Sequence, residues 1–197
     1  MSAAALSRNA DRTIATKRFD RNNGRRLHLH TAAGMLHADF RVPSAGYGEL
    51  LRLVGFVTRD QAAVDQMLLR MIFNVVAHNR DDHIKNHAFL MNDSGHWTLS
   101  PAYDITFSQG PGGEHSLDIA GEGRSPTTDH VFRVAAGVGI RTGFVKEALE
   151  KVAEVVSRWP EYASEVGLST PEMQRIGKFH CLLPSRKGVM PAKPAGE

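Results

Sequence analysis

The chain has 197 residues, of which 42% are hydrophobic and 23% charged, a balance ordinary for one globular domain or two small ones. Its 24 basic and 21 acidic residues leave a net charge of only +3, which argues against a protein dedicated to binding nucleic acid. The single cysteine excludes a disulfide within the chain and favours a reducing, cytoplasmic compartment. The sequence contains neither the apolar core of a signal peptide nor the roughly 18 apolar residues of a membrane span, so no membrane contact is expected.

The first predicted elements form a small β-hairpin. Residues 13–19 alternate loosely between apolar and polar side chains, as a short strand does. Asn22-Asn23-Gly24 then supplies a turn, and residues 27–30 form the returning strand. Proline and glycine make residues 31–48 a predicted loop, and a short helix is predicted over residues 49–54.

The clearest helix prediction covers residues 61–78. Apolar side chains recur there at intervals of three and four, which places them on one buried helix face. They are Val64, Met67, Leu68, Met71, Ile72, Val75 and Val76. Thr58 and Gln61 have the spacing of a capping box, so Thr58 is predicted to begin the helix.

A second hairpin is predicted after this helix. Residues 87–91 and 96–100 flank Asn92-Asp93-Ser94-Gly95, which predicts two strands joined by a four-residue turn. Pro101 ends the second strand, because proline cannot continue a strand ladder. The glycine-rich residues 108–127 are predicted to form a long, mobile loop.

Helices are predicted for the rest of the chain. Residues 129–136 follow Thr128 as their N-cap, and residues 144–159 end at Pro160. A last short helix is predicted over residues 171–182, with proline at its first position. Together these elements predict an α+β, mainly α fold, in which a helical bundle supports a small β-hairpin.

The residues that carry chemistry lie between the central helix and the second hairpin. Asp81 and Asn86 are five positions apart, as in a kinase catalytic loop, and Asp104 follows Asn86 by 18 positions. In phosphoryl transfer one carboxylate meets the attacking hydroxyl, while an amide and a second carboxylate hold Mg²⁺ against the phosphates. Oxygen ligands of this kind suit Mg²⁺, so Asp81 is the candidate base, and Asn86 and Asp104 are the candidate metal ligands.

The same loop has two other interpretations. A polar surface loop with an Asx cap and a turn aspartate would need the same residue types. A zinc or iron site is the second, because histidine and carboxylate side chains suit these metals. Its ligands would come from His78, Asp82, His83 and His87. Their spacing matches no established metal motif.

The helices near the C-terminus also have an alternative interpretation. A short helix, a glycine turn and a longer helix fit a helix-turn-helix DNA reader. The recognition helix of such a protein presents a basic, polar face at its N-terminus. The predicted helix over residues 144–159 instead begins Phe144-Val145-Lys146-Glu147, which is mixed in charge.

Three segments resemble the motifs of one protein family. Asp81-Asp82-His83-Ile84-Lys85-Asn86 resembles the D-x-H-x-K-N motif of HipA-like kinases. Leu99-Ser100-Pro101-Ala102-Tyr103-Asp104-Ile105 resembles their L-[ST]-P-x-Y-D-[IL] motif. Lys17-Arg18-Phe19-Asp20-Arg21 is similar to their R-F-D-R hinge strand, and the whole resemblance covers roughly residues 13–182.

The resemblance implies an ATP- and Mg²⁺-dependent Ser/Thr protein kinase, the toxin component of a toxin–antitoxin system. It assigns Asp81 as the catalytic base, and Asn86 and Asp104 as Mg²⁺ ligands. The residues that it places at the nucleotide site are Phe19, Asp20, His83, Lys85 and Tyr103. The implied partners are a protein substrate of the translation machinery and a DNA-binding antitoxin.

HipA-like kinases carry a further N-terminal lobe, with a phosphate-covering loop and a strand lysine. Only some twelve residues precede the hinge strand here, so the resemblance implies a C-terminal lobe with the N-lobe largely absent. We expect a disordered segment over residues 1–12, a HipA-like C-terminal kinase domain over residues 13–183 and a disordered tail over residues 184–197. A separate N-lobe would then complete the enzyme. The alternative is a non-catalytic module that binds an antitoxin or a substrate.

Overall fold

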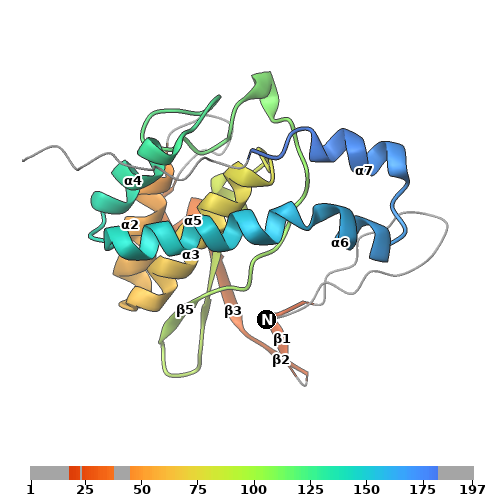
Figure 1. Cartoon of the computed structure of the whole chain (residues 1–197). Coiled ribbons are helices and arrows are strands. Elements are labelled where there is room, and N and C mark those ends of the chain that lie inside the picture. The colour runs from red at the N-terminus through yellow and green to blue at the C-terminus, as the bar shows by residue number, and fades with distance from the viewer. Residues whose placement is uncertain (1–17, 23, 38–44, 182–197) are drawn as a thin grey trace, which may run out of the picture.

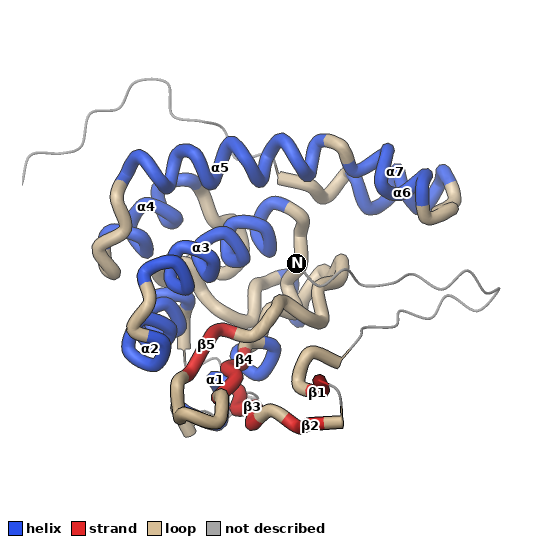
Figure 2. Tube along the Cα trace, turned by 90° about the horizontal axis from the view of Figure 1, so that it is seen from below, coloured by secondary structure: helices blue, strands red, loops and turns tan. Residues whose placement is uncertain are grey.

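Helices form most of the structure, and a small antiparallel sheet lies at one end of them (Figure 1, Figure 2). This computed structural model describes residues 18–22, 24–37 and 45–181. The strand predicted over residues 13–19 lies mostly outside the described residues, as do both predicted terminal segments. The predicted α+β, mainly α class is confirmed.

The sheet has three strands in the order β3-β4-β5. They are β3 (His28–Thr31), β4 (Ala88–Met91) and β5 (Trp97–Leu99), and both neighbouring pairs are antiparallel. The β4–β5 pair confirms the second predicted hairpin. A strand does form near residues 27–30, but its predicted pairing is wrong, because β3 pairs with β4 and not within the first hairpin. Separately, β1 (Arg21–Asn22) pairs with β2 (Arg25–Arg26) around the predicted turn.

The helices of the described residues follow the predicted order but differ at several ends. They are α1 (Ala32–Met35), α2 (Tyr47–Thr58), α3 (Gln61–Val76), α4 (Thr128–Ala136), α5 (Thr142–Ser157), α6 (Trp159–Glu165) and α7 (Thr170–Gly177). The loop predicted over residues 31–48 instead contains α1, because the Thr31 hydroxyl accepts a hydrogen bond from the Gly34 N–H and caps that turn. None of these helices has the length and apolar character needed to cross a bilayer.

Two predicted helix ends in the C-terminal part are wrong. Thr127, rather than Thr128, is the N-cap of α4, and its backbone N–H donates to the His130 ring at 3.1 Å. Pro160 does not stop helical structure but lies in the first turn of α6. Proline is tolerated there because the first backbone N–H groups of a helix have no partner within the helix.

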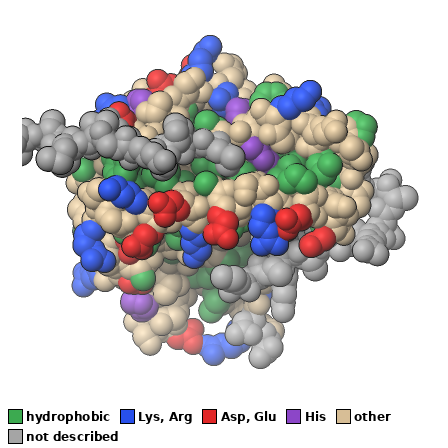
Figure 3. Space-filling view, in the orientation of Figure 1, with side chains coloured by type: hydrophobic (Ala, Val, Ile, Leu, Met, Phe, Trp, Pro, Cys, Tyr) green, Lys and Arg blue, Asp and Glu red, His purple; other side chains and the backbone are tan. Residues whose placement is uncertain are grey.

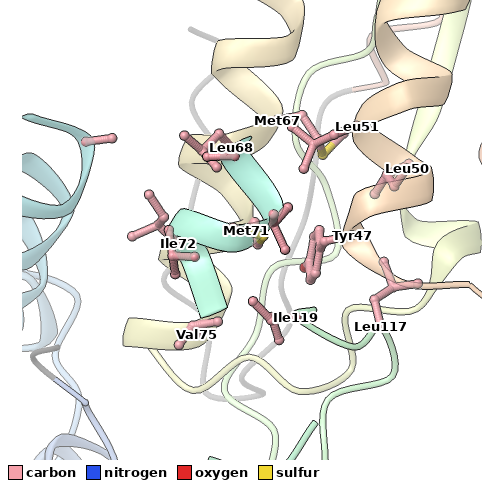
Figure 4. Close-up of a cluster of buried hydrophobic side chains, with 14 of the residues drawn as sticks. Tyr47, Leu50, Leu51, Met67, Leu68, Met71, Ile72, Val75, Leu117 and Ile119 are labelled. Carbon is pink, nitrogen blue, oxygen red and sulfur yellow. The ribbon is translucent and has the colours of Figure 1, made fainter. Parts of the chain in front are cut away.

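The central helix α3 carries the core. It packs against α2 on one side and against α5 on the other (Figure 2). Figure 4 shows side chains of α2 and α3 meeting there, with Leu117 and Ile119 joining them from the loop before α4. The predicted apolar face of α3 is buried along its whole length, from Val64 to Val76. Burying so much apolar surface makes α3 the rigid support from which the next loop projects.

The N-cap of α3 is Asp60, not the predicted Thr58. The Asp60 carboxylate accepts a hydrogen bond from the Ala62 N–H at 2.9 Å, whereas the Thr58 hydroxyl donates to the Val54 carbonyl. We expect Asp60→Ala to lower the free energy of unfolding by about 0.5 to 2 kcal/mol, because the first turn loses its cap. Urea denaturation measures this, and Asp60→Asn is the matched control that keeps a capping oxygen. Equal losses in both variants would contradict the capping role.

Candidate functional site

Half of the predicted site residues lie on the loop between α3 and β4, residues 79–86, here called the site loop. α3 ends at Val76, and His78 turns the chain in the left-handed conformation with a φ of 58°. The Asn79 N–H then bonds the Asn74 carbonyl at 2.8 Å. A single 3-10 turn, Ile84–Asn86, leads from the loop into β4. The site loop is therefore anchored at both ends, by a buried helix and by the middle strand of the sheet.

Residues 108–127, here called the glycine loop, run beside the site loop. The Arg80 N–H bonds the Ser108 carbonyl at 3.2 Å, and the Ser116 N–H and hydroxyl bond the Arg80 carbonyl at 3.2 Å and 3.0 Å. The Arg80 guanidinium also bonds carbonyl groups of the glycine loop. The backbone N–H and the carbonyl of Arg80, the residue before Asp81, thus both bond the glycine loop.

The two predicted metal ligands line one small cavity of about 20 Å³. Asn86 comes from the end of the site loop, and Asp104 comes from the segment that follows β5. The Asn86 Nδ2 donates to the backbone carbonyl of Asp81 at 3.0 Å. The Asp81 side chain is itself 49% exposed and does not line the cavity. The structure therefore places Asn86 and Asp104 at one cavity. Asp81 is linked to Asn86 through its backbone carbonyl.

Asp104 and Tyr103 connect the two sequence motifs. The Tyr103 hydroxyl donates to the Lys85 backbone carbonyl at 2.8 Å, which joins the segment after β5 to the site loop. Burial raises the pKa of Tyr103 to about 12, so this hydroxyl keeps its proton and remains a donor. Asp104 is exposed and adopts a φ of 54°, a left-handed conformation that aspartate tolerates better than most residues do.

The remaining predicted nucleotide-site residues lie around this pair of motifs. The Phe19 ring lies 5.6 Å from the Tyr103 ring, centroid to centroid, although Phe19 lies in a turn and not in the predicted strand. The Asp20 carboxylate accepts hydrogen bonds from the Arg18 guanidinium at 2.8 Å and 2.6 Å, and this guanidinium lowers the pKa of the carboxyl group. On the site loop, the His83 Nε2 lies 3.6 Å from an Asp81 carboxylate oxygen, and the Lys85 side chain is exposed.

The sequence did not indicate that Asp82 is a functional candidate at this site. Its side chain is fully buried, and the carboxylate accepts three hydrogen bonds from distant parts of the chain. The Tyr47 hydroxyl donates at 2.8 Å, the His115 Nδ1 lies at 2.9 Å, and the Ser116 N–H donates at 2.9 Å. Asp82 thus binds the site loop to the start of α2 and to the glycine loop. No short spacing pattern could have indicated partners that lie more than 30 positions away.

The residues of the alternative zinc or iron site contact different partners. The His78 ring lies 5.8 Å from that of Phe107, and the His87 ring lies 6.1 Å from that of Tyr47. Asp82 is engaged by its three donors. Within the residues that the structure describes, no group of three or more histidine, cysteine, aspartate or glutamate side chains is arranged to hold a metal ion.

The helices of the alternative DNA-reading motif pack into the core. α5 buries one face, including Val145, Leu149 and Val152, and lies against α3. Figure 3 shows acidic and basic side chains interspersed over the face of the molecule that carries α5. This face therefore lacks the single-sign basic stripe that is typical of DNA-binding surfaces.

The buried His87 makes stability depend on pH. Burial lowers its pKa to about 4, from an ordinary value of 6.5. Because the unfolded state takes up the proton first, the stability contributed by the neutral ring is complete above about pH 6.5 and is lost as the pH falls towards 4. We expect a lower free energy of unfolding at pH 5 than at pH 7, measured by urea denaturation.

The variant His87→Gln tests the source of this pH dependence. It should reduce the difference between the two pH values, because glutamine does not titrate. His78→Gln is the comparison, since burial also lowers the pKa of His78 to about 4 and this group titrates in the same window. An unchanged pH dependence in His87→Gln would contradict the assignment to His87.

The fold and the site geometry define a class of protein that is known from solved structures. HipA in the Shewanella oneidensis MR-1 toxin–antitoxin complex of HipA, HipB and operator DNA is similar to this chain with a TM-score of 0.63. The two share 20% sequence identity, over 84% of this chain and 45% of that one. At this level of identity the likeness shows a HipA-type fold.

The sequence places the chain in a family directly. The model of the family described as HipA-like C-terminal domain matches residues 1–159. The chain therefore belongs to this family. A Sinorhizobium fredii protein named "Putative kinase Y4dM" is 31% identical over 94 residues, which are 47% of this chain and 23% of that protein. The chain thus spans less than half the length of either relative.

Proposed function

We propose that the chain supplies the catalytic lobe of a HipA-type kinase that transfers phosphate from Mg-ATP to serine or threonine of a protein. The observation that carries the proposal is the shared cavity of Asn86 and Asp104, together with the hydrogen bond from Asn86 to the Asp81 backbone. This arrangement combines an amide with two carboxylates, the exposed one of Asp104 and the half-exposed one of Asp81. Those are the three groups that phosphoryl transfer requires of a kinase catalytic loop.

The residues present fit a magnesium ion. Asn86 uses its Nδ2 to bond the Asp81 carbonyl, so its amide oxygen is the atom that suits a metal. Asp104 adds an exposed carboxylate from the opposite motif. Magnesium is held by one or two such oxygen ligands, with waters and substrate phosphates completing its coordination. When bound, the ion neutralises and orients the phosphates of ATP.

The other residues would orient the reactants. Asp81, half exposed on the site loop, would accept the proton of the attacking hydroxyl, with His83 beside it. Lys85 would place a positive charge near the phosphates from the same loop. The aromatic pair of Phe19 and Tyr103, with Asp20 close by in the chain, would border the nucleoside.

We further propose the partners of the whole protein. HipA of Shewanella oneidensis was solved with HipB and operator DNA, so a DNA-binding antitoxin is the proposed partner of this family member. A protein of the translation machinery is the proposed substrate, in the cytoplasm. A nucleotide-clamping lobe, in the same or in a separate chain, would complete the ATP site.

Metal-dependent nucleotide binding tests the proposal. With the nucleotide-clamping lobe present, isothermal titration calorimetry should detect Mg-ATP binding that EDTA abolishes. Asp104→Asn should weaken the apparent Mg²⁺ affinity by at least about tenfold, since one of two protein ligands loses its charge. Asp93→Asn is the matched control, because Asp93 lies in the exposed turn between β4 and β5. Absence of Mg-ATP binding in the presence of the lobe would favour a non-catalytic interaction module.

A further inference from the structure

A chain of buried hydrogen bonds leads from Asp82 towards the Asn86–Asp104 cavity. The Tyr47 hydroxyl donates to the Asp82 carboxylate at 2.8 Å, and the Tyr47 oxygen accepts from the Asn74 Nδ2 at 2.8 Å. The Asn74 Oδ1 then accepts from the Asn79 Nδ2 at 3.1 Å. Because the Tyr47 hydroxyl gives its one hydrogen to Asp82, its oxygen accepts from the Asn74 amide, and the Asn74 oxygen in turn accepts from Asn79. The remaining amide atom of Asn79 is therefore an acceptor oxygen.

This oxygen is one of three buried atoms that need a partner at the same place. Asn79 Oδ1, Arg70 Nε and His87 Nε2 are buried and make no hydrogen bond to the protein. All three residues line the cavity of about 20 Å³ that Asn86 and Asp104 also line. A buried polar atom without a partner is destabilising, so three at one cavity indicate a bound molecule.

The chemistry of these atoms selects the ligand. The Arg70 Nε–H must donate, so the ligand must have a lone pair, and Asn79 Oδ1 must accept, so the ligand must have a hydrogen. A metal ion cannot accept a hydrogen bond, and a bare anion cannot donate one. Water does both, and it can pair with His87 Nε2 in either protonation state of the ring. The guanidinium of Arg70 also donates to the Ser100 carbonyl at 2.6 Å, which holds this side chain at the cavity.

The volume of the cavity agrees with one molecule of this size. A cavity needs at least about 10 to 15 Å³ to hold a water, and the water needs two to four polar partners. The Asn86–Asp104 cavity has about 20 Å³ and three such partners. An apolar molecule of that size would leave all three atoms unpaired.

We propose that this cavity is a specific hydration site, in which one ordered water bridges Asn79, Arg70 and His87. The water joins the elements that carry the candidate catalytic groups. Asn79 lies two positions before Asp81, and His87 directly follows Asn86. Arg70 holds the Ser100 carbonyl, four positions before Asp104. The water therefore sets the spacing between the site loop and the Asp104 segment, and it does so whether or not the protein is a kinase.

A high-resolution crystal structure of the full chain tests the site without reference to activity. We expect one solvent peak at hydrogen-bonding distance, about 2.7 to 3.2 Å, from Asn79 Oδ1, Arg70 Nε and His87 Nε2. An empty cavity, or side-chain conformers in which the three atoms find protein partners, would overturn the proposal. So would a peak with the short, octahedral contacts of a metal ion to Asn79 Oδ1 and His87 Nε2, whereas the magnesium of the proposed function would contact Asn86 and Asp104.

Oxygen-17 magnetic relaxation dispersion of the full chain provides a second test in solution, because it counts long-lived internal waters. Arg70→Met removes one of the three partners and should reduce the long-lived signal. Arg52→Met is the matched control, since Arg52 is exposed on α2 and pairs with Glu49 within its own helix. Equal signals from the two variants would overturn the assignment. If Arg70→Met does not fold, the crystal structure of the unaltered chain decides.

Discussion

Replacing Asp82 with alanine is expected to lower the free energy of unfolding by several kcal/mol, about 1 to 3 kcal/mol for each buried group left without its acceptor. The substitution leaves the Tyr47 hydroxyl, the His115 ring and the Ser116 N–H without the acceptor that they share. The Tyr47 hydroxyl and the His115 ring cannot turn to solvent, because these side chains are 0% and 1% exposed. Guanidinium denaturation at pH 7 measures the loss.

Two further variants make this result specific to the network. Asp93→Ala removes an exposed carboxylate that pairs with Arg25, and it should cost no more than about 1 kcal/mol. Asp82→Asn keeps the shape and one acceptor oxygen, so it should lose less stability than Asp82→Ala does. Equal losses for Asp82→Ala and Asp93→Ala would show that the buried network contributes nothing, and the anchoring role of Asp82 would be abandoned.

Asp81→Asn is expected to slow phosphoryl transfer by about 10² to 10⁴-fold, the usual contribution of a general base. Mg-ATP affinity should stay unchanged, because the candidate metal ligands are Asn86 and Asp104. The fold should be unaffected as well, since the Asp81 side chain is 49% exposed. Transfer of labelled phosphate to a protein acceptor, with the nucleotide-clamping lobe present, measures the rate.

The matched control for this prediction is Glu150→Gln, which removes a carboxylate from the exposed face of α5. It should leave the transfer rate within about twofold of the unaltered protein, as surface substitutions away from a site generally do. A transfer rate in Asp81→Asn equal to that of Glu150→Gln would show that Asp81 is not the base. The Mg-ATP experiment with Asp104→Asn would still stand independently.

Periodicity was sufficient to predict the helical body of this protein. The buried face of α3 repeats at three and four positions, and this local signal needs no knowledge of what the helix packs against. The hairpin of β4 and β5 was predictable for the same reason, because its turn residues lie between two apolar runs. Asn86 and Asp104, 18 positions apart in the sequence, line one cavity, and their roles as metal ligands stay a prediction.

What the sequence could not reveal depends on contacts between distant residues. Asp60 caps α3, and Thr58 does not. Thr58 still belongs to the buried end of α2, where its hydroxyl donates to the Val54 carbonyl. In the sequence, Asp82 suggested only a possible zinc or iron ligand. In the structure it is buried, because the fold brings Tyr47 and His115 to it. Local patterns carry no information on such partners.

The distances along the chain between Asp82 and its partners have a consequence for folding. Tyr47 and His115 lie 35 and 33 residues from Asp82, whereas the bonds within α2, α3 and α5 are local. Contacts between distant residues form late, because closing a long segment costs entropy before any bond repays it. On refolding, the helices should therefore gain hydrogen-exchange protection before Ser116 does. In the native state, the site loop should open at a lower free energy than the helical body, so that function can be lost while the helices persist.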